Sequence, residues 1–286
     1  MRHMGFVAFM AAALLATTAA AQTSTPPANA LWFSCDATAE KHLLATLEQA
    51  SPSVEAKSAD LAAAREAIRK AATLRDAALA GQGVEDPYGG AAHWARLAKA
   101  STSPRTAELF RRVAKDQFIR SHFTAAAART SWAAGLTDNA RGYAFGAVAR
   151  DGCGVDEDNT AWLKADIQAN GWFTLDSFGN DADQAAFLLV QHADKDPGFQ
   201  REVLAMLEPL LAQKQTRPTS YAYLFDRVAV ADKRPQRYGT QGRCTGPGVW
   251  EPFDVEAPDG LDQRRATVGL PTEAEYKTVF VKRCGA

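Results

Sequence analysis

The feature that most limits the possible folds of this chain is its helical periodicity. Long alanine-containing segments carry apolar residues at helical spacing. The segment 58–81, SADLAAAREAIRKAATLRDAALAG, is typical of them. Its larger apolar residues recur every three or four positions, which is the period of an amphipathic α-helix rather than the alternation of a half-buried strand. Comparable patterns follow along most of the chain. The sequence therefore predicts a mostly α protein, folded as a multi-helical globular array.

Cap residues indicate where helices of the first half begin and end. Ser58 is expected to cap the helix 58–81, and Gly81 to end it. The next helix should begin with Ser103 as its N-cap and Pro104 at its first position. The apolar stripes expected to face the core are Leu61, Ala64, Ile68, Ala72 and Leu79 in the first helix, and Leu109, Val113 and Phe118 in the second.

The acidic segment 156–159, DEDN, has two interpretations. Its carboxylates could line a calcium loop, but the glycine and the distant glutamate of such a loop are missing. Asp and Asn also cap helices, and acidic residues are favourable near a helix N-terminus. We therefore expect a helix to begin at Asp156–Asn159 and to end at Gly171.

Further helices are predicted in the second half, with little extended structure between them. Short extended segments are expected near residues 236–240 and 249–255, and a last helix in TEAEYKTVFVKRC, residues 272–284. The cap residues that predict the other helix starts are Asn180 paired with Asp183, Asp196 before Pro197, and Thr219 or Ser220.

The first 21 residues carry the three regions of a secretory signal peptide. Met1-Arg2-His3 gives a positive start, an apolar run follows, and Ala19-Ala20-Ala21 supplies the small residues before a cleavage site at Gln22. A membrane anchor is the alternative, but the apolar run is shorter than the ~20 residues that a spanning helix needs. We expect a periplasmic or secreted mature protein without stable membrane insertion.

Three regions are predicted downstream of residues 1–21. Residues 22–30 are expected to be a flexible leader, residues 31–150 an Ala-rich helical region, and residues 151–286 a helical domain that packs on it and carries the polar motifs. Lys+Arg 32 against Asp+Glu 33 gives a formal net charge of −1, so the chain has no excess of basic residues to bind phosphate backbones. Nucleic-acid binding is therefore not expected.

All four cysteines lie downstream of the predicted cleavage site, where disulfide bonds can form. No pair has the two-residue spacing of a zinc or redox site. Three pairings are possible. We favour Cys35–Cys153 together with Cys244–Cys284, because each bridge then ties one end of the chain to a large element.

Polar residues gather in three segments of the second half, VQHADKDPGFQ, YAYLFDRVAV and PQRYGTQ. His192 extends the apolar face of its helix, because it follows Leu188 by four positions and Leu189 by three. The sequence contains no Gly-x-Ser-x-Gly elbow, phosphate-binding Gly-Lys-Ser/Thr loop, His-Glu-x-x-His or dinucleotide-binding glycine pattern. A site must therefore be inferred from the polar segments themselves.

Together with DNTAWLKADIQANGW, these segments resemble a bacterial domain-of-unknown-function family. Its members repeat a His-Ala-Asp-x-Asp stretch, a Leu-x-Asp-Arg-Val helix and a Gln-x-Tyr-Gly-Thr-Gln stretch, and the resemblance covers roughly residues 150–243. It implies a shared polar centre but no activity. The residues in the recurring positions are His192, Asp194, Asp226, Arg227, Gln236, Tyr238, Gly239, Thr240 and Gln241.

This polar set has a structural and a functional interpretation. In the first, the side chains of segment 236–241 satisfy loop backbone, and Arg227 is held by Asp226 or Asp194, since buried polar groups need partners. In the second, the same groups surround a polar ligand and His192 carries protons. A metal held by His192, Asp194 and Asp226 is a weaker alternative, because no second histidine joins them.

The leading hypothesis is an exported helical protein with a small polar-ligand site, for which hydrolysis is one reaction class. The catalytic candidates are His192 and Asp226, and the ligand-binding candidates are Asp194, Arg227, Gln236, Tyr238, Thr240 and Gln241. No cofactor or metal is expected. The alternative is a non-catalytic helical module that binds a protein of the cell envelope. Only the ligand site requires the three polar segments to converge on a cavity.

Overall fold

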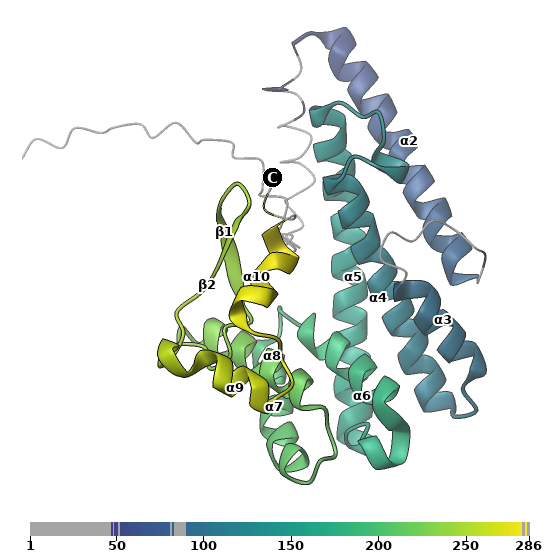
Figure 1. The fold of residues 1–286 in the computed structure, drawn as a ribbon. Coiled ribbons are helices and arrows are strands. Elements are labelled where there is room, and N and C mark those ends of the chain that lie inside the picture. The colour runs from purple at the N-terminus through teal and green to yellow at the C-terminus, as the bar shows by residue number, and fades with distance from the viewer. Residues whose placement is uncertain are drawn as a thin grey trace, which may run out of the picture.

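The computed structural model describes residue 47 and residues 49–50, 52–80, 82, 90–281 and 284. It is helical almost throughout, which confirms the predicted fold class (Figure 1). The predicted signal peptide 1–21, the leader 22–30, Cys35 and Gly81 lie outside the described residues. Within the described ranges, no helix combines the length and the apolar character that crossing a bilayer requires.

The first half of the described chain is a set of long helices around α4 and α5. α2 spans Val54–Leu79, α3 Gly90–Ala100, α4 Pro104–Ala127 and α5 Asp138–Asn170, with a 3₁₀ turn, η1, at Ser131–Ala133. α4 and α5 pack against each other, α3 packs on α4, and α2 packs on both α4 and α5 (Figure 1).

The predicted caps of these helices are only partly correct. Ser103 caps α4 as expected. The prediction for Ser58 is wrong, because α2 begins at Val54 and its N-cap is Ser53, whose hydroxyl accepts from a backbone N–H at 3.1 Å. Leu79, predicted to be in the apolar stripe, is 40 % exposed. Ala64 of the predicted stripe is buried and Ile68 packs against the core, and the other buried residues of α2 are Asp60, Ala67 and Ala71.

α5 is one continuous helix, which corrects the predicted helix start at Asp156–Asn159. Thr137 caps it, and Gly171 ends it with a φ of 73°, a conformation that glycine adopts without strain. Asp156 therefore lies inside the helix, one turn from residues that pack against α4. The predicted boundary between residues 150 and 151 also falls within α5.

Three helices follow α5. α6 spans Leu175–Gln191, α7 Pro197–Ala212 and α8 Pro218–Ala231. Asp196 caps α7 as predicted and accepts from the Phe199 N–H at 2.9 Å.

The helix start predicted at Asn180 coincides with a break in α6, but the Asp183 carboxylate accepts from Trp172, Thr216 and Arg217 and does not pair with Asn180. α6 begins after Thr174 and is broken at Gly179, and Asp183 is a wholly buried residue inside it. The predicted cap of α8 is wrong. α8 has Arg217 as its N-cap, so Thr219 and Ser220 lie in its first turn.

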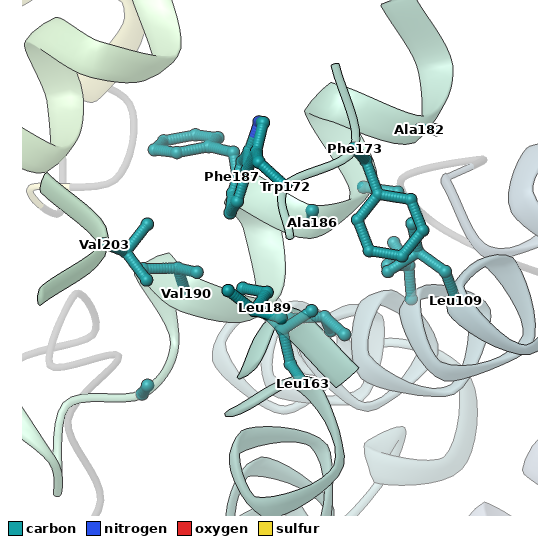
Figure 2. Close-up of a cluster of buried hydrophobic side chains, with 14 of the residues drawn as sticks. Leu109, Leu163, Trp172, Phe173, Ala182, Ala186, Phe187, Leu189, Val190 and Val203 are labelled. Carbon is teal, nitrogen blue, oxygen red and sulfur yellow. The ribbon is translucent and has the colours of Figure 1, made fainter. Parts of the chain in front are cut away.

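The apolar core consists mainly of two clusters that share α4 and α5. The α2 cluster joins α2 to the last turns of α4 and to α5 up to Val155. The α6 cluster joins α4 up to Ala114 and the end of α5 to α6, α7 and α8. Figure 2 shows part of the α6 cluster, with Leu109 and Phe173 on one side of α6 and Val203 on the other. The α4 segment 115–118 therefore lies between the two clusters.

A hairpin and two helices close the chain. β1, Gly242–Gly246, pairs antiparallel with β2, Val249–Pro252, and a 3₁₀ turn, η2 (Pro258–Gly260), precedes α9 (Leu261–Thr267) and α10 (Glu273–Val281). α10 packs on β2 (Figure 1). Extended structure occurs near both predicted segments: 249–255 contains β2, and in 236–240 Gln236 forms an isolated bridge to Val255, while strand β1 begins at Gly242.

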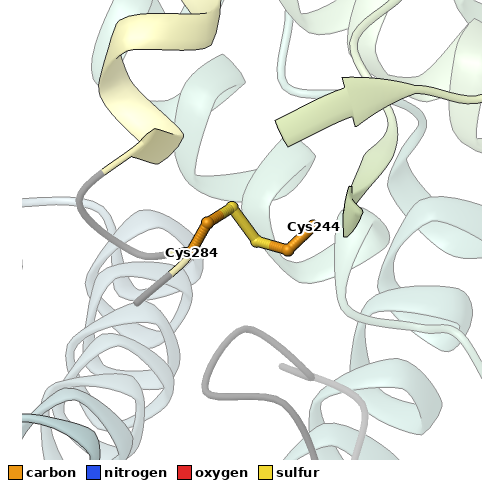
Figure 3. The surroundings of a disulfide bond; sticks show 2 residues. All are labelled: Cys244 and Cys284. Atoms are coloured by element: carbon orange, nitrogen blue, oxygen red, sulfur yellow. A yellow bond between two sulfur atoms is a disulfide. The ribbon is translucent and has the colours of Figure 1, made fainter. Parts of the chain in front are cut away.

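The predicted Cys244–Cys284 disulfide is present and joins β1 to the end of the chain (Figure 3). The two α-carbons are 5.5 Å apart. Cys153 is also disulfide-bonded, while Cys35, its predicted partner, lies outside the described residues.

Native protein that has not been reduced should not react with thiol reagents, because Cys153, Cys244 and Cys284 are all in disulfide bonds. We expect a thiol-reactive dye to label no cysteine before reduction, and all four cysteines of the chain after reduction in denaturant. Labelling of Cys244 or Cys284 in the native, unreduced protein would contradict this expectation.

Candidate functional site

The centre of the candidate site is an imidazole held between a carboxylate and a guanidinium. His192 follows the last residue of α6, and Asp116 and Arg120 lie one turn apart on α4. The Asp116 carboxylate accepts from His192 Nδ1, at 2.9 Å and 3.0 Å from its two oxygens. On the other side of the ring, Arg120 Nε donates to His192 Nε2 at 3.1 Å. His192 is therefore the neutral tautomer with its proton on Nδ1.

Asp156 brings α5 into the same network. Arg120 Nη2 donates to both oxygens of Asp156 at 3.1 Å, and Arg120 Nη1 lies 3.2 Å from Asp116 Oδ1. Gln117 completes the set by donating to Asp116 Oδ2 at 2.8 Å. We call Asp116, Arg120, Asp156 and His192 the His192 network. It lies between the two apolar clusters and connects α4, α5 and α6 there.

The network separates the pKa values of its two carboxyl groups. Burial opposes ionisation of Asp116, but attraction by Arg120 and His192 outweighs it and lowers the pKa of Asp116 to about 2. Burial raises the pKa of Asp156 to about 7, and repulsion by Asp116 adds to this although Arg120 acts against it. The Asp116 carboxyl group is thus ionised at neutral pH, while that of Asp156 has its pKa near neutral pH. Such pairs are characteristic of acid–base sites.

The imidazole also has a shifted pKa. Burial and the positive charges of Arg120 and Arg227 lower the pKa of His192, although Asp116 acts in the opposite direction. The ring therefore stays neutral around neutral pH and can accept a proton. Nε2 is the atom that would accept it, because Nδ1 already carries one.

Asp194 and Arg227 form an ion pair beside this network. Arg227 Nη1 donates to Asp194 Oδ1 at 2.7 Å, which is one of the two pairings expected from the sequence. Gln200 donates to the same oxygen at 3.1 Å. The charge of Asp194 contributes to raising the pKa of Arg120, as that of Arg227 contributes to lowering the pKa of His192. Both residues thus belong to the electrostatic surroundings of the imidazole.

Asp226 has a different role from the one expected. It is wholly buried on α8, and its oxygens accept from the backbone N–H groups of Arg237, Tyr238 and Thr240 at 2.9, 3.0 and 2.8 Å. Burial raises the pKa of Asp226, and these three donors act against the rise. The carboxylate therefore attaches the loop 236–241 to α8. None of its hydrogen bonds to described residues reaches the His192 network.

The loop 236–241 is also held from its other side. Gln236 is wholly buried; its amide donates to the carbonyl oxygens of Gln241 and Phe253 and accepts from the Gln241 N–H. Arg265 Nη1 donates to the Tyr238 carbonyl at 2.5 Å, and the Tyr276 hydroxyl donates to the Thr240 carbonyl at 3.1 Å. Gly239 permits the turn with a φ of 61°. This geometry supports the structural interpretation for Gln236, Tyr238, Thr240 and Gln241.

A metal ion fits the site poorly. Ligand atoms of Asp116, Asp156 and His192 lie within 4.8 Å of one another. Arg120 is paired with each of the three, so its guanidinium already supplies the positive charge that a cation would bring. The metal ligands predicted from the sequence, His192, Asp194 and Asp226, are a different set. Asp226 is not free to join it, because its oxygens accept hydrogen bonds from the loop backbone.

A pocket of about 230 Å³ lies between α6 and α8, and none of its lining residues belongs to the His192 network. Gln191 lines it, and Gln191 Nε2 lies 3.5 Å from His192 Nε2. Tyr223 lines it from α8, one turn before Arg227. The other lining residues are Gln184, Phe187, Leu188, Arg217, Thr219 and Ser220. We call this cavity the α6–α8 pocket.

Sequence reasoning missed Asp116, Arg120 and Asp156. The spacing of Asp116 was nevertheless informative, because it follows Val113 by three positions and so falls on the stripe predicted to face the core. A carboxylate on such a stripe requires a buried partner. Asp156 gave no such signal, since an acidic run at a helix start is ordinary.

The carboxyl group of Asp156 should make stability depend on pH. The pKa of Asp156 in the folded protein lies above the ordinary value of 3.8, so the carboxyl group ionises at a lower pH in the unfolded chain than in the folded protein. The free energy of unfolding therefore falls as the pH rises from 3.8 to about 7. We expect Asp156→Asn, which cannot ionise, to gain stability relative to wild type across this interval. Urea unfolding of both proteins at several pH values measures the gain. Both proteins contain His192, so its contribution to the pH dependence of stability cancels in the difference between them. A difference in stability that does not change with pH would contradict the raised pKa of Asp156.

Comparison with known proteins identifies a family but no characterised relative. The model of a family of unknown function (DUF6624) matches residues 106–285. The match extends beyond the resemblance noted at 150–243 and includes Asp116 and Arg120. No curated protein matches the chain, and no solved structure does. The chain therefore belongs to the family of unknown function DUF6624.

Proposed function

We propose that this protein is an exported acid–base enzyme that acts on a small polar substrate in the α6–α8 pocket. His192 accepts the proton, and hydrolysis is the reaction class. The observation that carries the proposal is the neutral imidazole, which a buried carboxylate orients and whose Nε2 lies 3.5 Å from the amide of Gln191, a residue that lines a pocket of about 230 Å³. Export is supported by the predicted signal peptide and by disulfide bonds, which persist in oxidising compartments.

The chemistry follows from the ring's two nitrogen atoms. Asp116 accepts a hydrogen bond from Nδ1–H, which fixes the tautomer and places the ring's lone pair on Nε2, where Arg120 Nε donates to it. A substrate hydroxyl or a water molecule that replaces Arg120 Nε at this lone pair can give its proton to the ring. Arg120 remains paired with Asp156 during the exchange. Asp116 then stabilises the imidazolium that forms.

Asp156 supports the same reaction. With a pKa raised to about 7, this carboxyl group is partly ionised at neutral pH, and its negative charge then helps Asp116 to stabilise the imidazolium, because the two carboxylates and the ring lie within 4.8 Å of one another. The pocket contributes polar groups from Gln184 and Gln191 and an apolar wall from Phe187 and Leu188. This combination suits a small molecule with both polar and apolar parts.

A thermal-shift screen with envelope sugars, peptides, nucleotides and divalent metals tests the proposal. We expect one of the first three classes to raise the melting temperature of wild type more than that of His192→Gln, in which an amide replaces the imidazole as donor or acceptor. The molecule found is then incubated with both proteins, and mass spectrometry should detect a product with wild type only. Arg227→Lys should weaken the response, since an ammonium does not reproduce the guanidinium.

His122→Gln is the matched control, because His122 is a buried histidine whose ring packs against Phe118 and Trp132. It should respond to the molecule as wild type does. Equal responses of wild type and His192→Gln would place the binding elsewhere and contradict the proposal. No response from any class would favour the alternative of a protein-binding helical module.

A further inference from the structure

The first turn of α8 presents hydrogen-bond donors to the α6–α8 pocket. Arg217 is the N-cap residue and makes no side-chain cap. Among the described residues, no acceptor binds the backbone N–H groups of Thr219 and Ser220. The N-terminus of a helix leaves such groups for an outside acceptor, and the aligned peptide dipoles favour an anion there.

Ser220 is an independent indication of a ligand at this place. Its side chain lines the pocket although the residue is only 3 % exposed. Its hydroxyl has no hydrogen-bond partner in the described part of the chain. Because buried polar groups in folded proteins are nearly always paired, an unpaired hydroxyl on a pocket wall marks a position for a ligand oxygen.

Arg217 adds a positive charge to the same wall. Its guanidinium lines the pocket and donates through Nη1 to the Gln184 side chain, which lines it too. The turn that carries Arg217 is fixed from the interior by Asp183, which accepts from the Arg217 N–H at 3.1 Å and from the Thr216 hydroxyl at 2.6 Å. Trp172 Nε1 donates to Asp183 as well, at 2.8 Å, so this buried carboxylate is fully engaged behind the turn.

We infer that the α6–α8 pocket binds an oxyanion, a phosphate or a carboxylate, between Arg217 and the first turn of α8. This deepens the proposed function and rests on it, because it assigns the substrate an anionic group. The oxygens would accept from the Thr219 and Ser220 N–H groups, the Ser220 hydroxyl and the guanidinium. Charge-assisted bonds of this kind are short and strong. Phe187 and Leu188 would contact the less polar part of the molecule.

The test is a titration of isotopically labelled full chain with inorganic phosphate and, separately, with acetate at constant ionic strength. We expect the amide signals of Thr219 and Ser220 to move saturably with at least one anion. Whichever binds more tightly identifies the group. Arg217→Gln should bind about tenfold more weakly or worse, which corresponds to one charge-assisted hydrogen bond.

Ser220→Ala keeps the inference testable if Arg217→Gln does not fold. It should bind several-fold more weakly yet melt as wild type does, because the hydroxyl has no internal partner to lose. Arg234→Gln is the matched control, since the Arg234 side chain is 52 % exposed beyond the other end of α8. It should bind as wild type does. Failure of both anions to bind, or equal binding by all variants, would overturn the inference.

His192→Gln distinguishes this inference from the proposed function. It should bind phosphate or acetate as wild type does, because Arg217 and the helix terminus remain. If anions bind through Arg217 but no turnover is found, the oxyanion site is supported and the proposed acid–base enzyme is contradicted. If turnover requires His192 but not Arg217, the proposed enzyme is supported and the oxyanion site is contradicted.

Discussion

Asp116→Ala is expected to lower the free energy of unfolding by about 3–5 kcal/mol. Asp116 is wholly buried and accepts from His192 and Gln117 while facing Arg120. Its removal takes away one of the negative charges that balance the buried Arg120 and leaves a ring nitrogen without its acceptor. Urea unfolding followed by circular dichroism measures the loss.

Asp158→Ala is the control for this substitution. Asp158 also joins α5 to α4, through an ion pair with Arg112, but its side chain is 68 % exposed. Exposed pairs contribute about 0–1 kcal/mol, so this variant should be nearly as stable as wild type. Similar unfolding midpoints for the two variants would show that the His192 network does not hold α4, α5 and α6 together.

Asp226→Ala is expected to destabilise the protein by about 3 kcal/mol or more, since three buried backbone N–H groups lose their acceptor. The loop 236–241 should loosen from α8, because the packing of Tyr238 against Ala222 and Phe225 is then no longer supported by these hydrogen bonds. Limited trypsin digestion should then cut after Arg237 in the variant well before it cuts wild type. Urea unfolding gives the accompanying loss of stability.

Asp232→Ala separates this effect from a general loss of charge on α8. Asp232 follows the last residue of α8 and forms ion pairs with Arg201 and Arg234, whose side chains are about half exposed. We expect it to change stability by less than about 1 kcal/mol and to leave the trypsin pattern as it is. Early cleavage after Arg237 in both variants, or in neither, would be inconsistent with the role of Asp226.

Periodicity predicted the helices and much of the core because it reports burial directly. Leu109, Val113 and Phe118 were expected in the core, and each is 1 % exposed or less. Helix starts were less predictable where several residues can cap. Ser53 and Ser58 are both suitable, and the alanines around them do not show which turn is buried.

The candidate site could be predicted only in part, because its partners are far apart in the sequence. His192 meets Asp116 across 76 positions, and Arg120 meets Asp156 across 36. Local rules assigned Asp156 to a helix start, whereas packing against α4 keeps α5 continuous through it. Asp226 was recognised as important, but no local pattern indicates that a carboxylate will bind the backbone of a loop rather than a ligand.

α5 gives the molecule a mechanical property that neither apolar cluster has alone. Its 33 residues form a rod of about 50 Å, with one half in the α2 cluster and the other in the α6 cluster. If either cluster unfolds, half of α5 loses its packing partners, and the other half of the same helix is destabilised. Heat should therefore melt both clusters in one cooperative transition, and a chain divided near residue 150 would leave each fragment with an unpaired stub of helix.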